Sequence, residues 1–431
     1  MVFASITFIY YFLPLFLIVY FVVPKKYKNI VLLLFSFIFY FYGEPKYILL
    51  MLIEVLFAYF MTRSLEENKS KSLLVIMLSF HLLLLCIFKY FNFILENVNS
   101  LIGGNISLLN IVLPIGISFY TFQIISYEID VYNGKVKASN SLIDFMTYVF
   151  LFPQLIAGPI VRYESIRDEL KERSVKSDEF SYGCKRFIIG LFKKVVIANN
   201  IGELASVLNG SSEVSILLYW MLGISYMLQI YFDFSGYSDI AIGIGRMIGF
   251  KFPENFDYPY MKDSVTNFWR YWHMTLGSWF RDYVYIPLGG NRVSVIKHIR
   301  NILVVWLLTG LWHGASWNFI IWGLYFGVIL IIEKYFLSKF LDRLPKVVRV
   351  IYTNFIVMIS FIIFSSDNLS SAVTVIHGMF SFGRLSLYNS FILYYVRSYG
   401  LIIVMGILFS TSILKNINEI LRKNKFMNGI I

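Results

Sequence analysis

Charge, cysteine and histidine are all scarce in this chain of 431 residues. Only 15% of its residues are charged and 58% are hydrophobic, whereas a soluble domain has about a quarter charged residues. Two cysteines, Cys86 and Cys184, are too few for a disulfide framework or a cysteine-rich metal site. The five histidines are scattered and form no metal-binding tract. We therefore expect no bound metal and a chain whose solvent is mostly lipid.

Long apolar stretches make up much of the chain, and the mean hydropathy is +0.67. Several of them approach the ~20 residues that cross a hydrocarbon core, and they lack the alternation of barrel strands. Because lipid satisfies no backbone hydrogen bonds, these stretches must be helices. We predict an all-α, polytopic membrane protein with one domain over residues 1–431 and about ten to eleven spans.

The net charge of +12 comes from basic residues that gather in short loops between the apolar stretches. The positive-inside rule assigns such loops to the cytoplasm. This places the N-terminus outside and argues against nucleic acid as a partner. The basic segments are Lys25–Lys28, Arg63–Lys71, Arg292–Arg300, Lys334–Arg349 and the tail Lys415–Lys425.

Two apolar segments, Ile111–Tyr132 and Phe145–Val161, are interrupted by proline, glycine and amide residues. Irregular backbone at membrane depth is tolerated only where it lines a cavity or is buried in protein. A simple packing kink is the alternative. Because each segment carries an amide, Gln123 in the first and Gln154 in the second, we favour the walls of a cavity.

Two carboxylates, Asp233 and Asp239, lie between the apolar runs Ile216–Ile230 and Ile240–Phe250. Charges at membrane depth are costly, so a functional role is the default hypothesis. The alternative is that both residues cap helices and pair with Arg246.

The segment Ser264–Tyr283 has the periodicity of one amphipathic helix that begins at an Asp263 or Ser264 cap. Its three tryptophans lie on the apolar side, which is typical of a helix in the membrane interface, here on the cytoplasmic side. The polar side carries Asn267, Arg270 and His273. By this pattern alone, His273 is most simply a solvated histidine.

His313 is the most informative single residue, because it lies between the apolar runs Leu303–Leu308 and Ile320–Leu330. An imidazole in a membrane is unusual and is the natural proton acceptor near neutral pH. The small residues that follow, Gly314 to Ser316, allow a ligand or another backbone to approach closely. The alternative is a histidine that hydrogen-bonds a neighbouring helix.

No nucleophile elbow, phosphate-binding loop or metalloprotease motif is present, which argues against a covalent hydrolase or an ATP-driven machine. A single buried base suits transfer between two bound substrates. In that scheme His313 deprotonates an acceptor hydroxyl, which then attacks an activated carbonyl.

Eight motifs follow one another along the chain: Phe41–Pro45, Phe88–Tyr90, Leu113–Gln123, Phe152–Ile160, Tyr231–Asp239, Asn267–His273, Tyr285–Arg292 and Leu311–Asn318. Together and in this order they resemble the membrane-bound O-acyltransferase family. The similarity is greatest to the branch with alginate O-acetyltransferase membrane subunits and peptidoglycan O-acetyltransferases. The chain departs from the family at Ser365, where an arginine commonly follows Phe364.

The resemblance implies a ring of helices around a thinned central funnel or tunnel, in a bacterial-type cell membrane. It makes His313 the catalytic histidine and His273 the second characteristic polar position. It also implies acetyl transfer from cytoplasmic acetyl-coenzyme A to a surface polysaccharide such as alginate or peptidoglycan, through an extracytoplasmic SGNH-type partner. Candidate tunnel-lining residues are Gln123, Gln154, Asn267, Arg270, Trp312 and Asn318.

Two other functions stay open from the residues alone. A proton-coupled transporter or flippase would use His313 and Asp233 as a proton relay. A scaffold would only recruit a soluble acyltransferase.

Overall fold

A computed structural model describes residues 1–156, 158–413 and 415, and within them it is helical, with two isolated bridges and no strand. The predicted all-α class is confirmed. Except for Lys415, the basic tail Lys415–Lys425 lies outside the described residues. The α-helices are α1 Leu13–Val22, α2 Lys28–Gly43, α3 Ile48–Asn68, α4 Lys71–Ile102, α5 Ile117–Tyr132, α6 Leu142–Phe150, α7 Phe152–Leu155, α8 Tyr163–Lys171, α9 Ser177–Phe192, α10 Asn199–Asn209, α11 Ile216–Met247, α12 Val265–Tyr271, α13 Met274–Phe280, α14 Val295–His313, α15 Trp317–Ile332, α16 Ser338–Leu341, α17 Lys346–Ser365, α18 Leu369–Met379 and α19 Ser390–Phe409.

Seven helices among the described residues are long and apolar enough to cross a membrane. They are α3, α4, α11, α14, α15 with its extension to Leu341, α17 and α19. The sequence-based count of ten to eleven is higher because it includes segments that form shorter helices. For example, α2 and α5 have 16 residues each, or about 24 Å at 1.5 Å per residue, against the ~30 Å of a hydrocarbon core.

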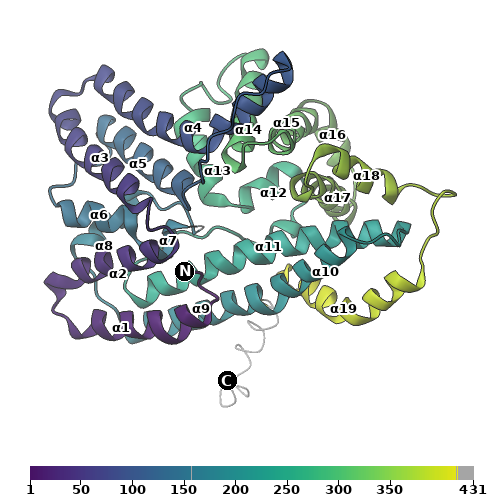
Figure 1. The fold of residues 1–431 in the computed structure, drawn as a ribbon, viewed down its shortest axis with the longest axis horizontal. Coiled ribbons are helices and arrows are strands. Elements are labelled where there is room, and N and C mark those ends of the chain that lie inside the picture. Colours follow the sequence, from purple (N-terminus) through teal and green to yellow (C-terminus); the bar gives the residue numbers. More distant parts are fainter. Residues whose placement is uncertain (157, 414, 416–431) are drawn as a thin grey trace.

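Helix α11 runs across the middle of the molecule (Figure 1). Two groups of helices lie along it: α1 to α8 toward the left of this view and α14 to α18 toward the upper right, with α4 next to α14. The short helices α12 and α13 lie between the groups, next to α11 in this view. The segment that contains α12 and α13 therefore lies in the middle of the fold, next to both groups of helices.

The chain from Ser177 to Met247 folds into a long hairpin in which α9, the π-helical turn Lys193–Ala198 and α10 pack along α11. The close approach of α9 to α11 depends on small residues, since a Cβ atom added at Gly190 of α9 would lie 2.6 Å from the carbonyl oxygen of Gly236 in α11. Small residues at helix crossings replace the hydrophobic effect as the source of tight packing in lipid.

Both carboxylates of this hairpin lie within α11, and the alternative in which they pair with Arg246 is wrong, since Arg246 pairs with Glu179. Asp239 pairs with Arg186 and Lys193, each at 2.7 Å, and Asp233 pairs with Lys194. The three basic residues belong to α9 and the π-helical turn, which pack on α11. They lie about 40 to 55 positions before the two aspartates in the chain, so no local sequence pattern indicates the pairing.

A buried polar cluster joins α3, α4 and α5 in the N-terminal group. His81 contacts the carboxylates of Glu54 at 2.9 Å and Glu128 at 3.0 Å, and all three side chains are fully buried. Buried charges in a membrane protein pair with one another. This cluster therefore fixes the three helices in one register.

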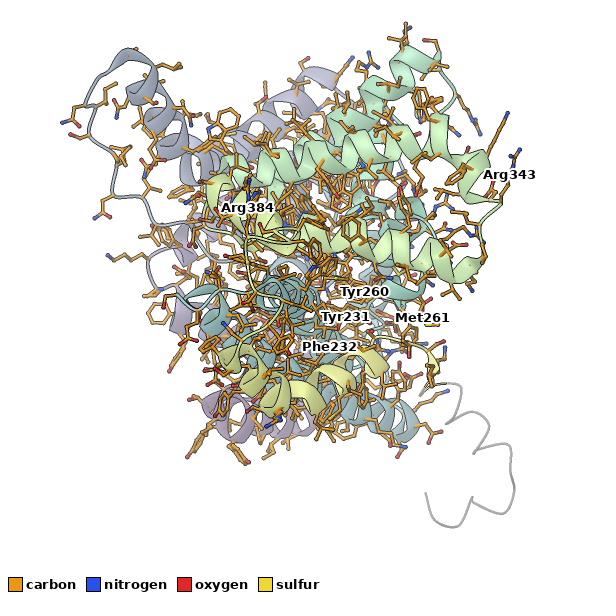
Figure 2. All side chains as sticks on the ribbon, turned by 90° about the vertical axis from the view of Figure 1, so that its right-hand side faces the viewer. Tyr231, Phe232, Tyr260, Met261, Arg343 and Arg384 are labelled. Carbon is orange, nitrogen blue, oxygen red and sulfur yellow. The ribbon has the colours of Figure 1, made fainter. Side chains whose placement is uncertain are left out.

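The middle of the fold is filled by aromatic side chains. Tyr231 of α11 contacts Tyr260 at 5.2 Å and Trp272 at 5.9 Å between ring centroids. Figure 2 shows Tyr231 and Tyr260 in the interior, whereas Arg343 projects from the edge. This aromatic packing holds the segment that carries His273 against α11.

Candidate functional site

The predicted single amphipathic helix is two helices, α12 and α13, that break at His273. Ser264 caps the start, as predicted, by accepting a hydrogen bond from the Asn267 N–H. His273 has a φ of +44°, in the left-handed region that bulky residues rarely adopt. It is also only 2% exposed, so it is a buried group and not the solvated one that its position on the polar side suggested. A strained, buried histidine is typical of a functional site.

Asn255 holds the His273 ring in one orientation. Its Oδ1 atom lies 3.0 Å from His273 Nδ1 and 2.9 Å from the Thr275 hydroxyl, while its Nδ2 donates to Ser238 Oγ at 3.1 Å. Since an amide oxygen can only accept, Nδ1 carries the proton. The Nε2 atom is buried and has no partner among the described residues.

Burial lowers the pKa of His273 well below its ordinary value, and the nearby His313 acts in the same direction. The ring is therefore neutral at physiological pH, with its proton on Nδ1 and a free lone pair on Nε2. A buried nitrogen that lacks a partner carries a desolvation cost. It is an acceptor that a bound substrate can satisfy.

His313 is the last residue of α14, and α14 and α15 form a hairpin with an unusually close crossing. A Cβ atom added at Gly310 would lie 2.3 Å from the Phe319 carbonyl oxygen. The imidazole contacts the rings of Trp322 at 4.9 Å and Phe364 at 5.2 Å. No hydrogen bond to its ring nitrogens forms within the described part of the chain.

Trp312 brings the two histidines together, although 40 positions separate them in the chain. Its ring lies 5.8 Å from the His273 ring and 5.0 Å from the His313 ring, by centroids. Trp312 is itself buried. Two imidazoles that are free at one or both nitrogens thus share one apolar wall, the arrangement needed to handle a proton away from bulk water.

A cavity of about 500 Å³ lies between α10, α11 and the end of α17, next to the histidines. Two aromatic residues in its lining join it to the site: Phe234 contacts His273 at 4.6 Å, and Phe364 contacts His313 at 5.2 Å. Its polar lining residues are Ser206, Asn209, Tyr226, Gln229, Asp233 and Ser365.

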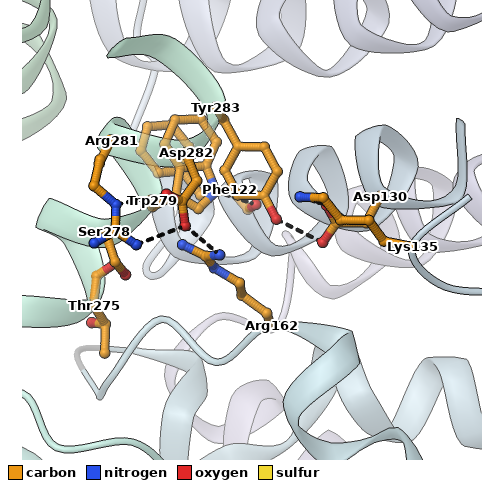
Figure 3. A network of polar contacts seen from close by, with 10 residues as sticks. All are labelled: Phe122, Asp130, Lys135, Arg162, Thr275, Ser278, Trp279, Arg281, Asp282 and Tyr283. Carbon is orange, nitrogen blue, oxygen red and sulfur yellow. Dashed lines mark hydrogen bonds and ion pairs between the residues drawn. The ribbon is translucent and has the colours of Figure 1, made fainter. Parts of the chain in front are cut away.

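The residues that follow α13 form a network of charged contacts (Figure 3). Asp282 accepts hydrogen bonds from Arg281 at 2.7 Å and Arg162 at 2.8 Å. Although burial opposes the change, these two hydrogen bonds lower the pKa of Asp282. In the same network, Tyr283 donates to Asp130 at 2.7 Å, and Lys135 pairs with that carboxylate at 3.1 Å.

Tunnel-lining roles were predicted for six residues, and the structure places these residues in different surroundings. Trp312 is in the site. Gln123 and Gln154 are both buried near Tyr148, and neither amide nitrogen nor oxygen of Gln123 has a partner among the described residues. Asn267 and Arg270 contact each other at 3.3 Å, and Arg270 is exposed.

Asn318, the sixth of these residues, holds two helices together. Its amide donates to the backbone carbonyl of Ser366 at 2.7 Å, beyond the end of α17. Its link to the site is through the neighbouring α17 residue Phe364, which contacts His313.

The sequence did not point to Asn255, Phe234 or Phe364 as site residues. Phe234 lies among the aromatic residues around Asp233, and Phe364 lies at the end of an apolar run, so in both places one phenylalanine is indistinguishable from the next. Asn255 lies in a connection between helices, and only its contact with His273, 18 positions later, shows its role. Among the described residues, no group of three or more histidine, cysteine or acidic side chains could hold a metal ion.

Comparison with known proteins gives a consistent set of relatives. Residues 37–374 match the family described as MBOAT, membrane-bound O-acyltransferase family. A probable alginate O-acetylase AlgI of Azotobacter vinelandii is 41% identical over 399 residues, which cover 90% of this chain and 79% of that protein. A peptidoglycan O-acetyltransferase of Helicobacter pylori is 35% identical over 427 residues, with 90% and 81% covered. A teichoic acid D-alanyltransferase of Streptococcus thermophilus is 30% identical over 307 residues, with 63% and 72% covered.

Proposed function

This chain belongs to the membrane-bound O-acyltransferase family, and we propose that it moves an acetyl group from cytoplasmic acetyl-coenzyme A to an extracytoplasmic polysaccharide. The family resemblance read from the motifs is confirmed, and the chain is an acyltransferase. The names of its relatives support acetyl as the acyl group and alginate or peptidoglycan as the type of acceptor. We place the enzyme in a bacterial-type cell membrane with its N-terminus outside, as the basic loops favour.

The observation that carries the catalytic proposal is the pair of histidines around Trp312. Within the described part of the chain, the His313 ring nitrogens have no hydrogen-bond partner and His273 Nε2 is bare. His313 accepts the proton of an acceptor hydroxyl as the oxygen attacks the thioester carbonyl. The tetrahedral intermediate then expels the thiolate, which takes the proton from His313 and leaves as free thiol. His273 orients one of the two substrates with its Nε2 lone pair.

Basic residues at one end of α13 support entry of the donor from that side. Helix α13 begins after His273, and the π-helical turn Arg281–Tyr285 follows its end. Arg281 therefore lies about 12 Å along the helix axis from His273, and Arg162 shares the Asp282 carboxylate with it. Phosphate groups of coenzyme A are anions that arginine recognises well. The cavity beside Phe234 and Phe364 supports a separate approach for the acceptor, and an extracytoplasmic SGNH-type partner passes the acetyl group on to the polysaccharide.

Substitution His313→Ala tests the catalytic assignment directly. We expect it to abolish O-acetylation of surface polymer while membrane insertion and expression are unchanged. The measurement is the acetate that mild alkali releases from the polymer, at matched amounts of enzyme in the membrane. His377→Ala is the matched control, since His377 is exposed and, among the described residues, its ring hydrogen-bonds to Ser381 at the end of its own helix. Normal acetylation by the His313 variant would contradict the proposal and favour a scaffold.

A further inference from the structure

Two neighbouring residues of α4 bind the end of the helix that carries His313. The Lys89 ammonium donates to the backbone carbonyl of Trp312, and the Tyr90 hydroxyl donates to the carbonyl of Leu311 at 2.5 Å. Leu311 and Trp312 immediately precede His313 in α14. These contacts join segments more than 200 positions apart in the chain.

The two carbonyls are groups that a helix cannot satisfy by itself. The last four carbonyls of an α-helix have no N–H partner within the helix, and here the chain leaves α14 at Gly314 in an extended conformation. In a membrane interior, water does not reach such groups freely and leaving them unpaired is costly. A cation at this negative end of the helix dipole is favourable as well.

Lys89 has no acidic partner that would explain it otherwise. No described carboxylate pairs with it, and its other hydrogen bond, at 3.0 Å, goes to the Ser118 hydroxyl at the start of α5. A partly buried lysine without a counter-ion is costly in a membrane-spanning helix. Its contacts fix α4, α5 and the end of α14 at one point, directly beside the Trp312 ring at 5.8 Å.

We propose that Lys89 and Tyr90 are positioning residues, which act together as a clamp on the carbonyls of Leu311 and Trp312. The clamp fixes the last turn of α14 and so fixes the direction of the His313 imidazole. This inference rests on the proposed catalytic role of His313. It also gives the Phe88–Tyr90 motif a physical role, as a cap supplied by one helix to the end of another.

The test compares acetyl transfer by Lys89→Met, Tyr90→Phe and Lys89→Arg in membrane vesicles supplied with labelled acetyl-coenzyme A. Lys89→Met keeps the length of the side chain but cannot donate, and we expect kcat to fall about 100-fold, as for a reacting group displaced by about 1 Å. Tyr90→Phe removes one of two donors and should cost about 10-fold. Lys89→Arg still donates and should restore most of the rate. The KM for acetyl-coenzyme A should not change, because the clamp does not touch the donor.

A matched control separates positioning from general loss of structure. Tyr325→Phe removes another tyrosine hydroxyl that donates to a helix carbonyl, that of Ile356 at 2.9 Å. Tyr325→Phe should keep the wild-type kcat.

Two outcomes would overturn the clamp. One is a normal kcat in Lys89→Met. The other is an equal loss in Lys89→Met and Lys89→Arg with a lower melting temperature, which would show a purely structural lysine. Activity retained by His313→Ala would instead overturn the proposed function, so the two failures are distinguishable.

Discussion

The close crossing of α14 and α15 allows a sharp prediction for Gly310→Ala. The added Cβ atom would lie 2.3 Å from the Phe319 carbonyl oxygen, and the reciprocal contact at Gly323 is equally short, 2.3 Å from the Trp306 carbonyl oxygen. Ordinary contact between such atoms begins near 3.4 Å, so the two backbones must separate by about 1 Å. Neither atom belongs to a flexible side chain that could move aside.

That separation should affect both stability and rate. Overpacking of this kind costs about 1–3 kcal/mol. His313 lies one helical turn after Gly310, so its imidazole moves with the end of α14. A shift of about 1 Å in a catalytic group lowers the rate about 100-fold. We therefore expect Gly310→Ala to lose most O-acetylation while the folded protein is still recovered from the membrane.

The measurements are the initial rate of acetyl incorporation and the melting temperature of the detergent-solubilised protein. Gly400→Ala is the matched control, because it makes the same change in the membrane helix α19 at a position with no atom within 4 Å. Its rate should be unchanged, and its stability unchanged or slightly higher, by up to about 1 kcal/mol of helix propensity. A fully active and stable Gly310→Ala variant would refute the link between this crossing and the site.

Two further predictions concern the segment around α13. Asn255→Leu removes the acceptor for His273 Nδ1–H and for the Thr275 hydroxyl. Because each unpaired buried donor costs about 1–3 kcal/mol, both the melting temperature and the kcat should fall. A variant with a normal kcat would show that the tautomer of His273 does not matter. Asp282→Asn removes a carboxylate whose pKa is lowered in the folded state, so its stabilising contribution is present above the ordinary carboxyl pKa of about 4 and is lost as pH falls through the lowered value. Unfolding curves should show the variant less stable than wild type near pH 7, with a difference that shrinks below about pH 4; a difference that stays constant with pH would contradict this account.

Some properties of this protein follow from its sequence because they depend on local pattern or on composition. Scarcity of charge and long apolar stretches determine a helical membrane protein, since lipid leaves the backbone no other partner. Ser264 is a helix cap because its hydroxyl reaches an N–H three residues on. His313 stands out because an imidazole between apolar runs is costly there.

Only the tertiary structure decided how these parts form a site. The break at His273 could not be predicted, because the apolar period continues through it and the cause is Asn255, which lies in a different segment. The ion pairs of Asp233 and Asp239 went to the packed hairpin and not to Arg246, because side-chain reach is set by which helices touch. The two histidines meet at Trp312, and Lys89 reaches the end of α14, through contacts between distant parts of the chain. The sequence shows which residues are neighbours along the chain, whereas the chemistry of the site depends on which residues are neighbours in space.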